Sequence, residues 1–357
     1  MDKVIRIGGV VLVILVMLTG CKSSIGAKTV VRDQFDYAEA LRDAAKEQML
    51  LNMVGLRYAE APQFLKVTSV INQYSLEGNI NVLSPPYDGA AAIGSPVGAG
   101  ARFSDRPTLT YIPLSGAEFT KSVLTPIPPK SIMSMIQAGW RADILLRLTV
   151  RSINGVAPTS RVGGSDADPK YYELVSLIDE VQNAGGLSFR VEQRGEAEVA
   201  LVTIPHDPED GLESKRNRID EILGVAPDLQ EYKLVFAQRA SSPDEIAMLT
   251  HSILEMLVDL AMFIDVPPEH ITGGRTRQSR ETGVMNSYGF EPMIRVLHSK
   301  DKPDDAFVRV RYEGTWFFIP HDDLRSKRTL SFMQLMFSLA ESGGGQQAPV
   351  VTVGAGG

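Results

Sequence analysis

The chain has 357 residues, is 44% hydrophobic and carries a formal net charge of −7. This length is sufficient for two domains, or for one domain with large excursions. The acidic balance argues against a nucleic-acid partner, because phosphate binding requires a basic stripe. Because Cys21 is the only cysteine, no internal disulfide can form and the core has to be held by packing.

The first twenty residues have the three parts of a secretory signal peptide. Lys3 and Arg6 supply the positive start, residues 7–18 form a short apolar core, and two small residues follow. Twelve apolar residues are too few for a membrane-spanning helix, which needs about 20. The sequence therefore predicts a signal peptide over residues 1–20 that is removed.

The signal ends in Leu18-Thr19-Gly20-Cys21. This run resembles the lipobox of bacterial lipoproteins, and the resemblance covers the first 21 residues. It implies that the Cys21 thiol is acylated and that Cys21 becomes the new first residue. Lys22 stands where lipoproteins retained in the inner membrane often carry Asp, which implies an anchor in the outer membrane facing the periplasm. The multiple acyl chains of this family make such an anchor durable.

A polar lipidated tether is expected over residues 21–32, followed by a helix from Asp33 to Tyr58. The helical segment contains no Pro, is rich in Ala, Leu, Met, Glu and Lys, and can be capped by Asp33 or Asp36. Pro62 ends it.

The clearest periodicity in the chain follows this helix. From Tyr74 to Val82 apolar and polar residues alternate, and the alternation resumes from Ala99 to Tyr111 after a segment rich in Pro, Gly and Ala. Period two indicates strands, so residues 33–118 are predicted to hold a long helix and an extended two-stranded hairpin. Candidate membrane-contacting or subunit-contacting residues on its apolar face are Tyr74, Leu76, Ile80, Val82, Phe103, Leu109 and Tyr111.

Residues 119–342 are predicted to form a mixed body of helices and antiparallel strands, which makes the chain α+β. Ser242 with Glu245 is interpreted as a capping box that opens a helix. The Arg-rich segment 273–286 is predicted to be a mobile loop, and residues 343–357 form a Gly-rich tail. Helices are expected over 131–138, 171–182, 242–264 and 329–341, and strands over 143–153, 187–191, 197–204, 232–238, 293–298, 307–312 and 315–319.

Patterns that could carry chemistry are weak. The histidines are widely spread, with no i, i+4 pair for zinc, and are interpreted as surface or core residues: His206, His251, His270, His298 and His321. Residues 206–210 concentrate carboxylates but lack the EF-hand pattern, and Ser165 lies in only a loose likeness of a nucleophile elbow. The sequence therefore predicts no catalytic residue, no metal site and no cofactor.

Two further features remain. Trp140 and the run Trp316-Phe317-Phe318 are interpreted as core or cross-strand packing rather than as a ligand cage. The run Ser326-Lys327-Arg328 precedes the last predicted helix and either binds an anion at the helix N-terminus or forms a solvated basic turn.

Three function classes stay open. The favoured one is a non-enzymatic lipoprotein that acts in the structure or assembly of the cell envelope. The alternative is a subunit of an oligomeric outer-membrane pore or export channel, since each arm has about the length of a transmembrane strand, 9 to 11 residues. In that case hairpin 74–111 inserts, with Tyr74 and Tyr111 near its base, and several subunits must close a ring. The third is a periplasmic hydrolase. The expected partners are membrane lipid, through acylated Cys21, and another protein or a second copy.

Overall fold

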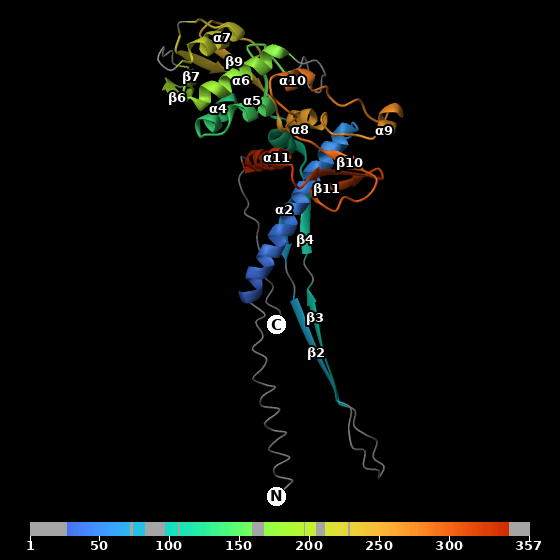
Figure 1. Ribbon diagram of the computed structural model, residues 1–357. Helices are drawn as coiled ribbons and strands as arrows, with labels where there is room; N and C mark the ends of the chain where they lie inside the picture. The colour runs from blue at the N-terminus through green and yellow to red at the C-terminus, as the bar shows by residue number, and fades with distance from the viewer. Residues whose placement is uncertain are drawn as a thin grey trace, which may run out of the picture. The chain divides into compact units, whose positions relative to one another are not determined.

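The computed structural model describes residues 27–71, 74–82, 97–105, 108–158, 168–195, 197–204, 211–227 and 229–342 (Figure 1). The signal peptide, Cys21, Ser165, His206 and the tail lie outside these ranges. The chain divides into two compact units, residues 1–49 and residues 50–357. Its helices and mixed sheets confirm the predicted α+β class.

The predicted N-terminal helix is α2 (Ala27–Arg57). It begins inside the stretch expected to be a tether. Its last turns belong to the second unit, where Leu50, Met53 and Val54 are buried. Asn52 and Arg57 are buried as well and only Leu51 of these turns is exposed, so this end of the helix is buried on most sides.

A two-stranded ribbon follows in two sections. β1 (Leu65–Ile71) pairs with β4 (Thr108–Pro113), and β2 (Tyr74–Val82) pairs with β3 (Val97–Asp105), both antiparallel. The predicted hairpin is thus present, but its first arm begins earlier than expected, at Leu65.

The register corrects one expectation about this hairpin. Tyr111 is paired with Val67 of β1, whereas Tyr74 is paired with Asp105 of β3. Leu109 likewise belongs to the β1–β4 section, opposite Val70. The prediction missed β1, and so it placed Tyr74 and Tyr111 at one level when they lie in different sections of the ribbon.

The body is built on a five-stranded sheet of order β5-β9-β8-β7-β6, in which only the β8–β9 pair is parallel. Apolar side chains of its helices and strands meet in one core, among them Ile136, Ile178, Ile219, Val202 and Leu234. The strands are β5 (Val150–Ile153), β6 (Ser188–Arg194), β7 (Ala197–Thr203), β8 (Glu231–Val235) and β9 (Glu245–Thr250). The helices that accompany the sheet are α4 (Pro129–Gln137), α5 (Ala142–Thr149), α6 (Pro169–Asn183) and α7 (Glu213–Leu223), the last not predicted.

The strand predicted over residues 143–153 is wrong for most of its length. Residues up to Thr149 form α5, and only the last four residues form β5. The Thr149 hydroxyl donates to the Leu145 carbonyl one turn back, at 2.7 Å. A short, almost continuous apolar run fits a buried helix as well as a strand, so its periodicity could not decide.

The helix predicted over residues 242–264 is also wrong in its first part. Residues 245–250 form β9 between β5 and β8, and the helix is the shorter α8 (Ile253–Ala261). Its capping box is Ser252 with Glu255, whose carboxylate accepts from the Ser252 N–H at 2.8 Å. Ser242 and Glu245 have the same spacing, but Glu245 is the first residue of β9 and is paired with Lys233 of the parallel strand β8.

A three-stranded sheet of order β10-β12-β11 contains β10 (Leu297–Ser299), β11 (Ala306–Tyr312) and β12 (Thr315–Pro320). The β11–β12 turn has positive φ at Glu313 and Gly314, 44° and 86°, as a type I′ hairpin requires. The strand predicted from Met293 begins only at Leu297. The remaining elements are α3 (Gly116–Phe119), the π-helical turn Thr120–Leu124, α9 (Pro268–Thr272), α10 (Gly283–Ser287) and the last helix, α11 (Leu324–Ser342).

The segment 273–286, predicted as a mobile loop, contains part of α10 and is held by buried side chains. The Arg57 guanidinium donates to the Arg277 carbonyl, and the Thr276 hydroxyl donates to the Arg57 carbonyl, both at 2.5 Å. Arg280 forms an ion pair with Asp259 at 3.0 Å. These long-range contacts with the end of α2 and with α8 order a polar stretch that has no periodicity of its own.

Replacing Asn154 tests how much its hydrogen bonds, which connect β9 to the end of α7, stabilise the body. Asn154 has φ of 48°, donates to the Leu223 carbonyl at 2.8 Å and accepts from the Ala247 N–H at 2.6 Å. Asn154→Ala is expected to lower the free energy of unfolding by roughly 2 to 3 kcal/mol through two lost hydrogen bonds and backbone strain. Asn154→Gly removes only the hydrogen bonds and should cost less. Urea denaturation measures both, and an equal cost for the two variants would contradict the strain argument.

Candidate functional site

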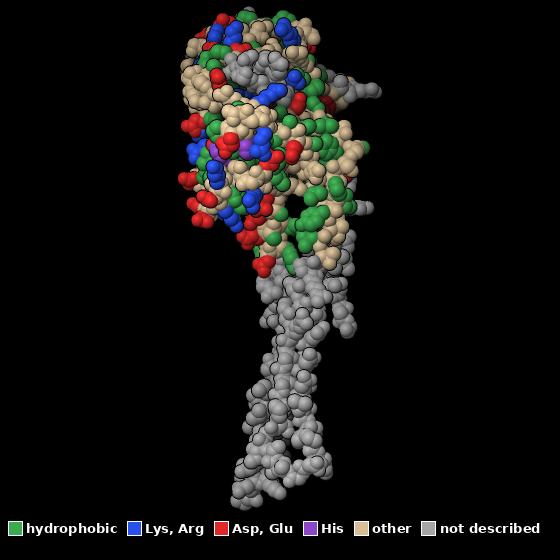
Figure 2. Space-filling view, turned by 90° about the vertical axis from the view of Figure 1, so that its right-hand side faces the viewer, with side chains coloured by type: hydrophobic (Ala, Val, Ile, Leu, Met, Phe, Trp, Pro, Cys, Tyr) green, Lys and Arg blue, Asp and Glu red, His purple; other side chains and the backbone are tan. Residues whose placement is uncertain are grey.

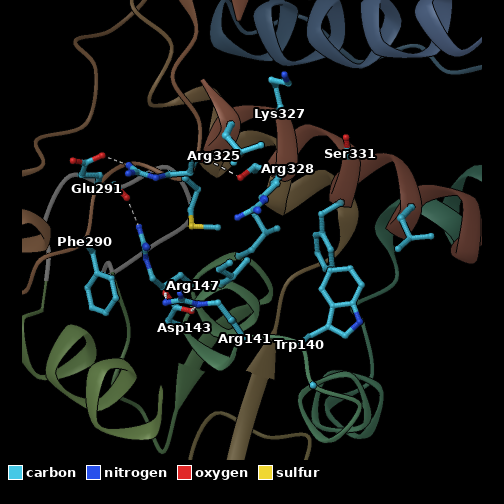
Figure 3. A pocket seen from close by; sticks show the side chains of 18 of the residues that line it. Trp140, Arg141, Asp143, Arg147, Phe290, Glu291, Arg325, Lys327, Arg328 and Ser331 are labelled. Atoms are coloured by element: carbon cyan, nitrogen blue, oxygen red, sulfur yellow. Dashed lines mark hydrogen bonds and ion pairs between the residues drawn. The ribbon is translucent and has the colours of Figure 1, made fainter. Parts of the chain in front are cut away.

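An open cleft of about 1100 Å³ lies between α5, α11 and the segments 138–141 and 289–293 (Figure 3). Basic side chains are concentrated in its lining, which holds Arg141, Arg147, Arg325, Lys327 and Arg328 against the carboxylates of Asp143 and Glu291. On the face that Figure 2 shows, acidic and basic side chains are interleaved. The cleft is therefore a local positive region on a chain of negative net charge.

Arg147 comes from α5 and is half-buried. Its Nη2 donates to the Glu291 carbonyl at 2.5 Å, and its guanidinium lies 4.7 Å from the Phe290 ring centre. No carboxylate of the described ranges forms an ion pair with it. Burial lowers the pKa of this guanidinium, and the charge of Asp143, which is hydrogen-bonded to Arg141, offsets only part of this effect.

Two other arginines of the lining are neutralised internally. Arg141 donates through Nε and Nη2 to the two oxygens of Asp143, at 2.9 and 3.0 Å. This hydrogen bonding and the charge of Asp143 raise the pKa of Arg141. Arg325 forms an ion pair with Glu291. These two pairs shape the cleft wall but leave little free positive charge.

The remaining basic residues lie on α11. Lys327 donates to the His321 carbonyl at 3.0 Å and lies 5.3 Å from the Phe307 ring, so its charge is engaged at the edge of the cleft. Arg328 is exposed, and it forms no hydrogen bond or ion pair with any residue that the structure describes. Figure 3 shows its side chain extending from α11 into the cavity. Arg147 and Arg328 are therefore the cations available to a ligand.

The opposite end of the cleft is apolar. The Trp140 ring lies 5.3 Å from the Phe332 ring, and Leu335 follows Phe332 along α11. Trp140 keeps 41% of its surface exposed and Leu335 43%. Trp140 therefore packs on Phe332 but does not belong to the buried core, whereas Phe317 of the run 316–318 is fully buried. The site is cationic at one end and aromatic and aliphatic at the other.

The anion site considered at residues 326–328 is not present at the helix N-terminus. α11 begins at Leu324, and the Asp323 carboxylate caps it by accepting from the Ser326 N–H at 3.0 Å. The Ser326 hydroxyl is buried and donates to the same carboxylate at 2.7 Å. A carboxylate thus occupies the position that an anion would need. Lys327 and Arg328 of this run line the cleft instead, Lys327 at its edge.

The histidines of the described ranges take structural positions. His251 is buried with Nε2 3.6 Å from Asp259, and His298 has Nδ1 3.0 Å from Asp265. His270 is buried beside Tyr58, and His321 is exposed. Within the residues that the structure describes, no group of three or more His, Cys, Asp or Glu side chains could hold a metal ion.

The sequence prediction missed this cleft. The candidate hairpin residues belong to β2, β3 and β4 and do not line it, and Cys21, Ser165 and His206 lie outside the described ranges. Arg147 was assigned to a strand, so its relation to α11 could not be seen. The one signal in the sequence is the positive charge of the run 326–328, two residues of which line the cleft.

The comparisons with known proteins add no assignment: no family model, curated protein or solved structure matches the chain. Among the described helices, none has both the length and the apolar character needed to cross a bilayer.

Acid is expected to destabilise the protein through His270. Its Nδ1 lies 2.6 Å from the Tyr58 hydroxyl, and burial lowers its pKa below the ordinary value of about 6.5. Since the fold favours the neutral ring, its contribution to stability is complete above pH 6.5 and is lost as the pH falls further. Urea denaturation at pH 7.5 and 5.5 should show a smaller acid-induced loss in His270→Gln than in the unmodified protein. Equal losses would refute the assignment to His270.

Proposed function

We propose that this chain is a non-enzymatic lipoprotein, anchored in the outer membrane through acylated Cys21 and facing the periplasm, that acts in the structure or assembly of the bacterial cell envelope. The lipobox supports the anchor. The observation that supports a structural or assembly role is the register of the β2–β3 ribbon, because it favours association with another protein chain.

The register brings residues of like polarity together. Leu76 is paired with Phe103 and Ile80 with Ala99, while Glu77 is paired with Arg102. Because paired positions of a ribbon alternate between its two faces, the apolar positions of both strands share one face. This face runs from the Leu76–Phe103 pair to the Val82–Val97 pair, and Asp105 opposite Tyr74 ends it.

The ribbon also has open edges. In the described part of the chain β2 and β3 form a sheet of two strands only. An isolated two-stranded ribbon is marginally stable in water, and each free edge is a template for pairing with another strand. A partner that covers the apolar positions would stabilise the ribbon, and a partner strand that pairs with an edge would satisfy its free backbone groups. Both effects support a protein-binding role.

The base of the ribbon is attached to the body. Phe64, just before β1, is buried and its ring lies 4.6 Å from that of Phe337 on α11. The Leu114 N–H, just after β4, donates to the Phe64 carbonyl at 2.8 Å. Both arms therefore start from one packed point, as an arm that presents a binding face to a partner requires.

The second candidate is a subunit of an oligomeric outer-membrane pore or export channel. In its favour, β2 and β3 have nine residues each, close to the 9 to 11 of a transmembrane strand. Insertion would need several copies, because a single ribbon leaves backbone groups unpaired in hydrocarbon. Tyr74 and Tyr111 lie in different sections of the ribbon and so do not form one aromatic level at its base, which weakens the case for a pore. A periplasmic hydrolase is the third candidate, to be tested at Ser165, His206 and Asp207.

Substitutions at neighbouring ribbon positions test the proposed binding face. Ile80→Asp places a charge among the apolar positions, whereas Asn79→Asp places the same charge among the polar ones. Chemical crosslinking in intact outer membranes should give a complex of defined mass with the unmodified protein and with Asn79→Asp, and should lose it with Ile80→Asp. Circular dichroism controls for folding. A complex that survives Ile80→Asp would exclude this face as the contact.

Electron microscopy and vesicle conductance then separate the two candidates. A scaffold protein should leave reconstituted vesicles sealed to ions. Closed rings that conduct ions would replace the scaffold proposal with the pore. A monodisperse monomer without any crosslinked partner would contradict both.

Replacing Cys21 tests the anchor. Cys21→Ser removes the acylated thiol, so labelled palmitate should no longer be incorporated and the chain should leave the outer-membrane fraction. Membrane fractionation with metabolic labelling measures both effects. Persistent labelling in Cys21→Ser would show that acylation occurs elsewhere.

A further inference from the structure

We propose that the cleft between α5 and α11 binds a single anionic lipid molecule. Its acidic headgroup lies between Arg147 and Arg328, and its apolar part lies on Trp140, Phe332 and Leu335. This site goes beyond the proposed envelope role and does not depend on it, because none of these residues belongs to the ribbon or the anchor.

The cationic end calls for an oxyanion. Arg147 is half-buried without a carboxylate partner in the described ranges, and a desolvated charge of this kind is costly until an opposite charge compensates it. Within the described ranges only the Nη2 of Arg147 makes hydrogen bonds, to the Glu291 carbonyl and the Met285 sulfur. The N–H groups of Nε and Nη1 are therefore available to a ligand. Arg328 enters the same cavity from the opposite wall (Figure 3). Two guanidinium groups suit the planar oxygens of a phosphate or carboxylate.

The neutralised arginines narrow the choice of ligand. Arg141 is held by Asp143 and Arg325 by Glu291, so the free positive charge is confined to one end of the cleft. A single headgroup carrying one negative charge or two would match this pair of cations. A long acidic partner would need a row of free cations, which the lining does not offer.

The other end calls for hydrocarbon. Trp140 and Leu335 are each more than 40% exposed and lie beside the buried Phe332 ring. Covering apolar surface of this kind is favourable in proportion to its area. The cavity volume of about 1100 Å³ is at the upper end of the roughly 300 to 1000 Å³ of small-molecule sites, enough for a headgroup with part of an acyl chain.

The lining also argues against an extended peptide. It comes from α5, α11 and short connecting segments, and no strand edge of the described ranges borders it except through Phe307 of β11. Peptides bound in extended form usually pair with such an edge. A lipid needs no backbone pairing, so the helical walls suit it better.

Fluorescence of Trp140 tests the assignment. The chain has two tryptophans, so Trp316→Phe leaves Trp140 as the single reporter in the full lipoprotein, held in a fixed excess of nonionic detergent. The probes are dioctanoyl phosphatidylglycerol, dioctanoyl phosphatidylcholine and inorganic phosphate. Phosphatidylglycerol should change the fluorescence saturably. Phosphatidylcholine carries the same phosphodiester, but its choline cation cancels the net charge and is repelled by the two arginines, so it should bind at least about tenfold more weakly.

Arginine variants in the same background locate the headgroup. Arg328→Gln, at an exposed position, and Arg147→Gln should each weaken phosphatidylglycerol binding about tenfold or more. Arg311→Gln is the matched control, because Arg311 is an exposed arginine of β11 outside the cleft and should leave binding unchanged. If Arg147→Gln does not fold, the effect of Arg328→Gln on phosphatidylglycerol binding still tests the position of the headgroup.

Four outcomes would overturn the proposal. The first is the absence of a saturable response to phosphatidylglycerol, and the second is an equal affinity for phosphatidylcholine. The third is an affinity for inorganic phosphate as high as that for phosphatidylglycerol, which would indicate a site for oxyanions in general. The fourth is tighter binding of an acidic amphipathic peptide of Glu and Leu, which would assign the cleft to a protein partner.

Discussion

The burial of one face of α11 is the constraint on which the ribbon and the cleft both depend. Leu330, Met333 and Met336 are buried at spacings of three residues, which fixes the rotation of the helix about its axis. With that rotation set, Phe337 stacks on Phe64 at the base of the ribbon, and Arg328 stands over the cleft. A helix free to rotate would lose both the ribbon attachment and the upper wall of the cleft.

Polar contacts at the start of α11 reinforce this placement. The Ser326 hydroxyl accepts from the Arg295 N–H at 2.8 Å, and the Thr329 hydroxyl donates to the Met293 carbonyl at 2.7 Å. Both bonds tie the helix to the segment that carries Glu291, the residue whose carbonyl accepts from Arg147. The cationic end of the cleft is thus built on hydrogen-bonded backbone, and its unpaired charge is a property of a fixed geometry.

Local patterns predicted the elements whose stability is local. The alternation of residues 74–82 and 99–105 predicted the β2–β3 pairing, and the amphipathic pattern of residues 171–182 predicted α6. Patterns failed where a segment is buried on most sides. Residues 143–149 and 245–250 are both short apolar runs, yet one is a helix and the other a central strand, because the neighbouring elements decide which hydrogen bonds each can form.

The sequence by itself determined the α+β class, the polarity pattern of the ribbon and the expectation of an acylated Cys21, since each depends on residues adjacent in the chain. Only the tertiary structure decided that Arg147 and Arg328, 181 positions apart, line one cavity, and that Trp140 lies at its apolar end. The physical reason is that a site of this kind is made by packing. Its charge balance depends on which carboxylates the fold brings to each arginine, and no spacing within the sequence carries that information.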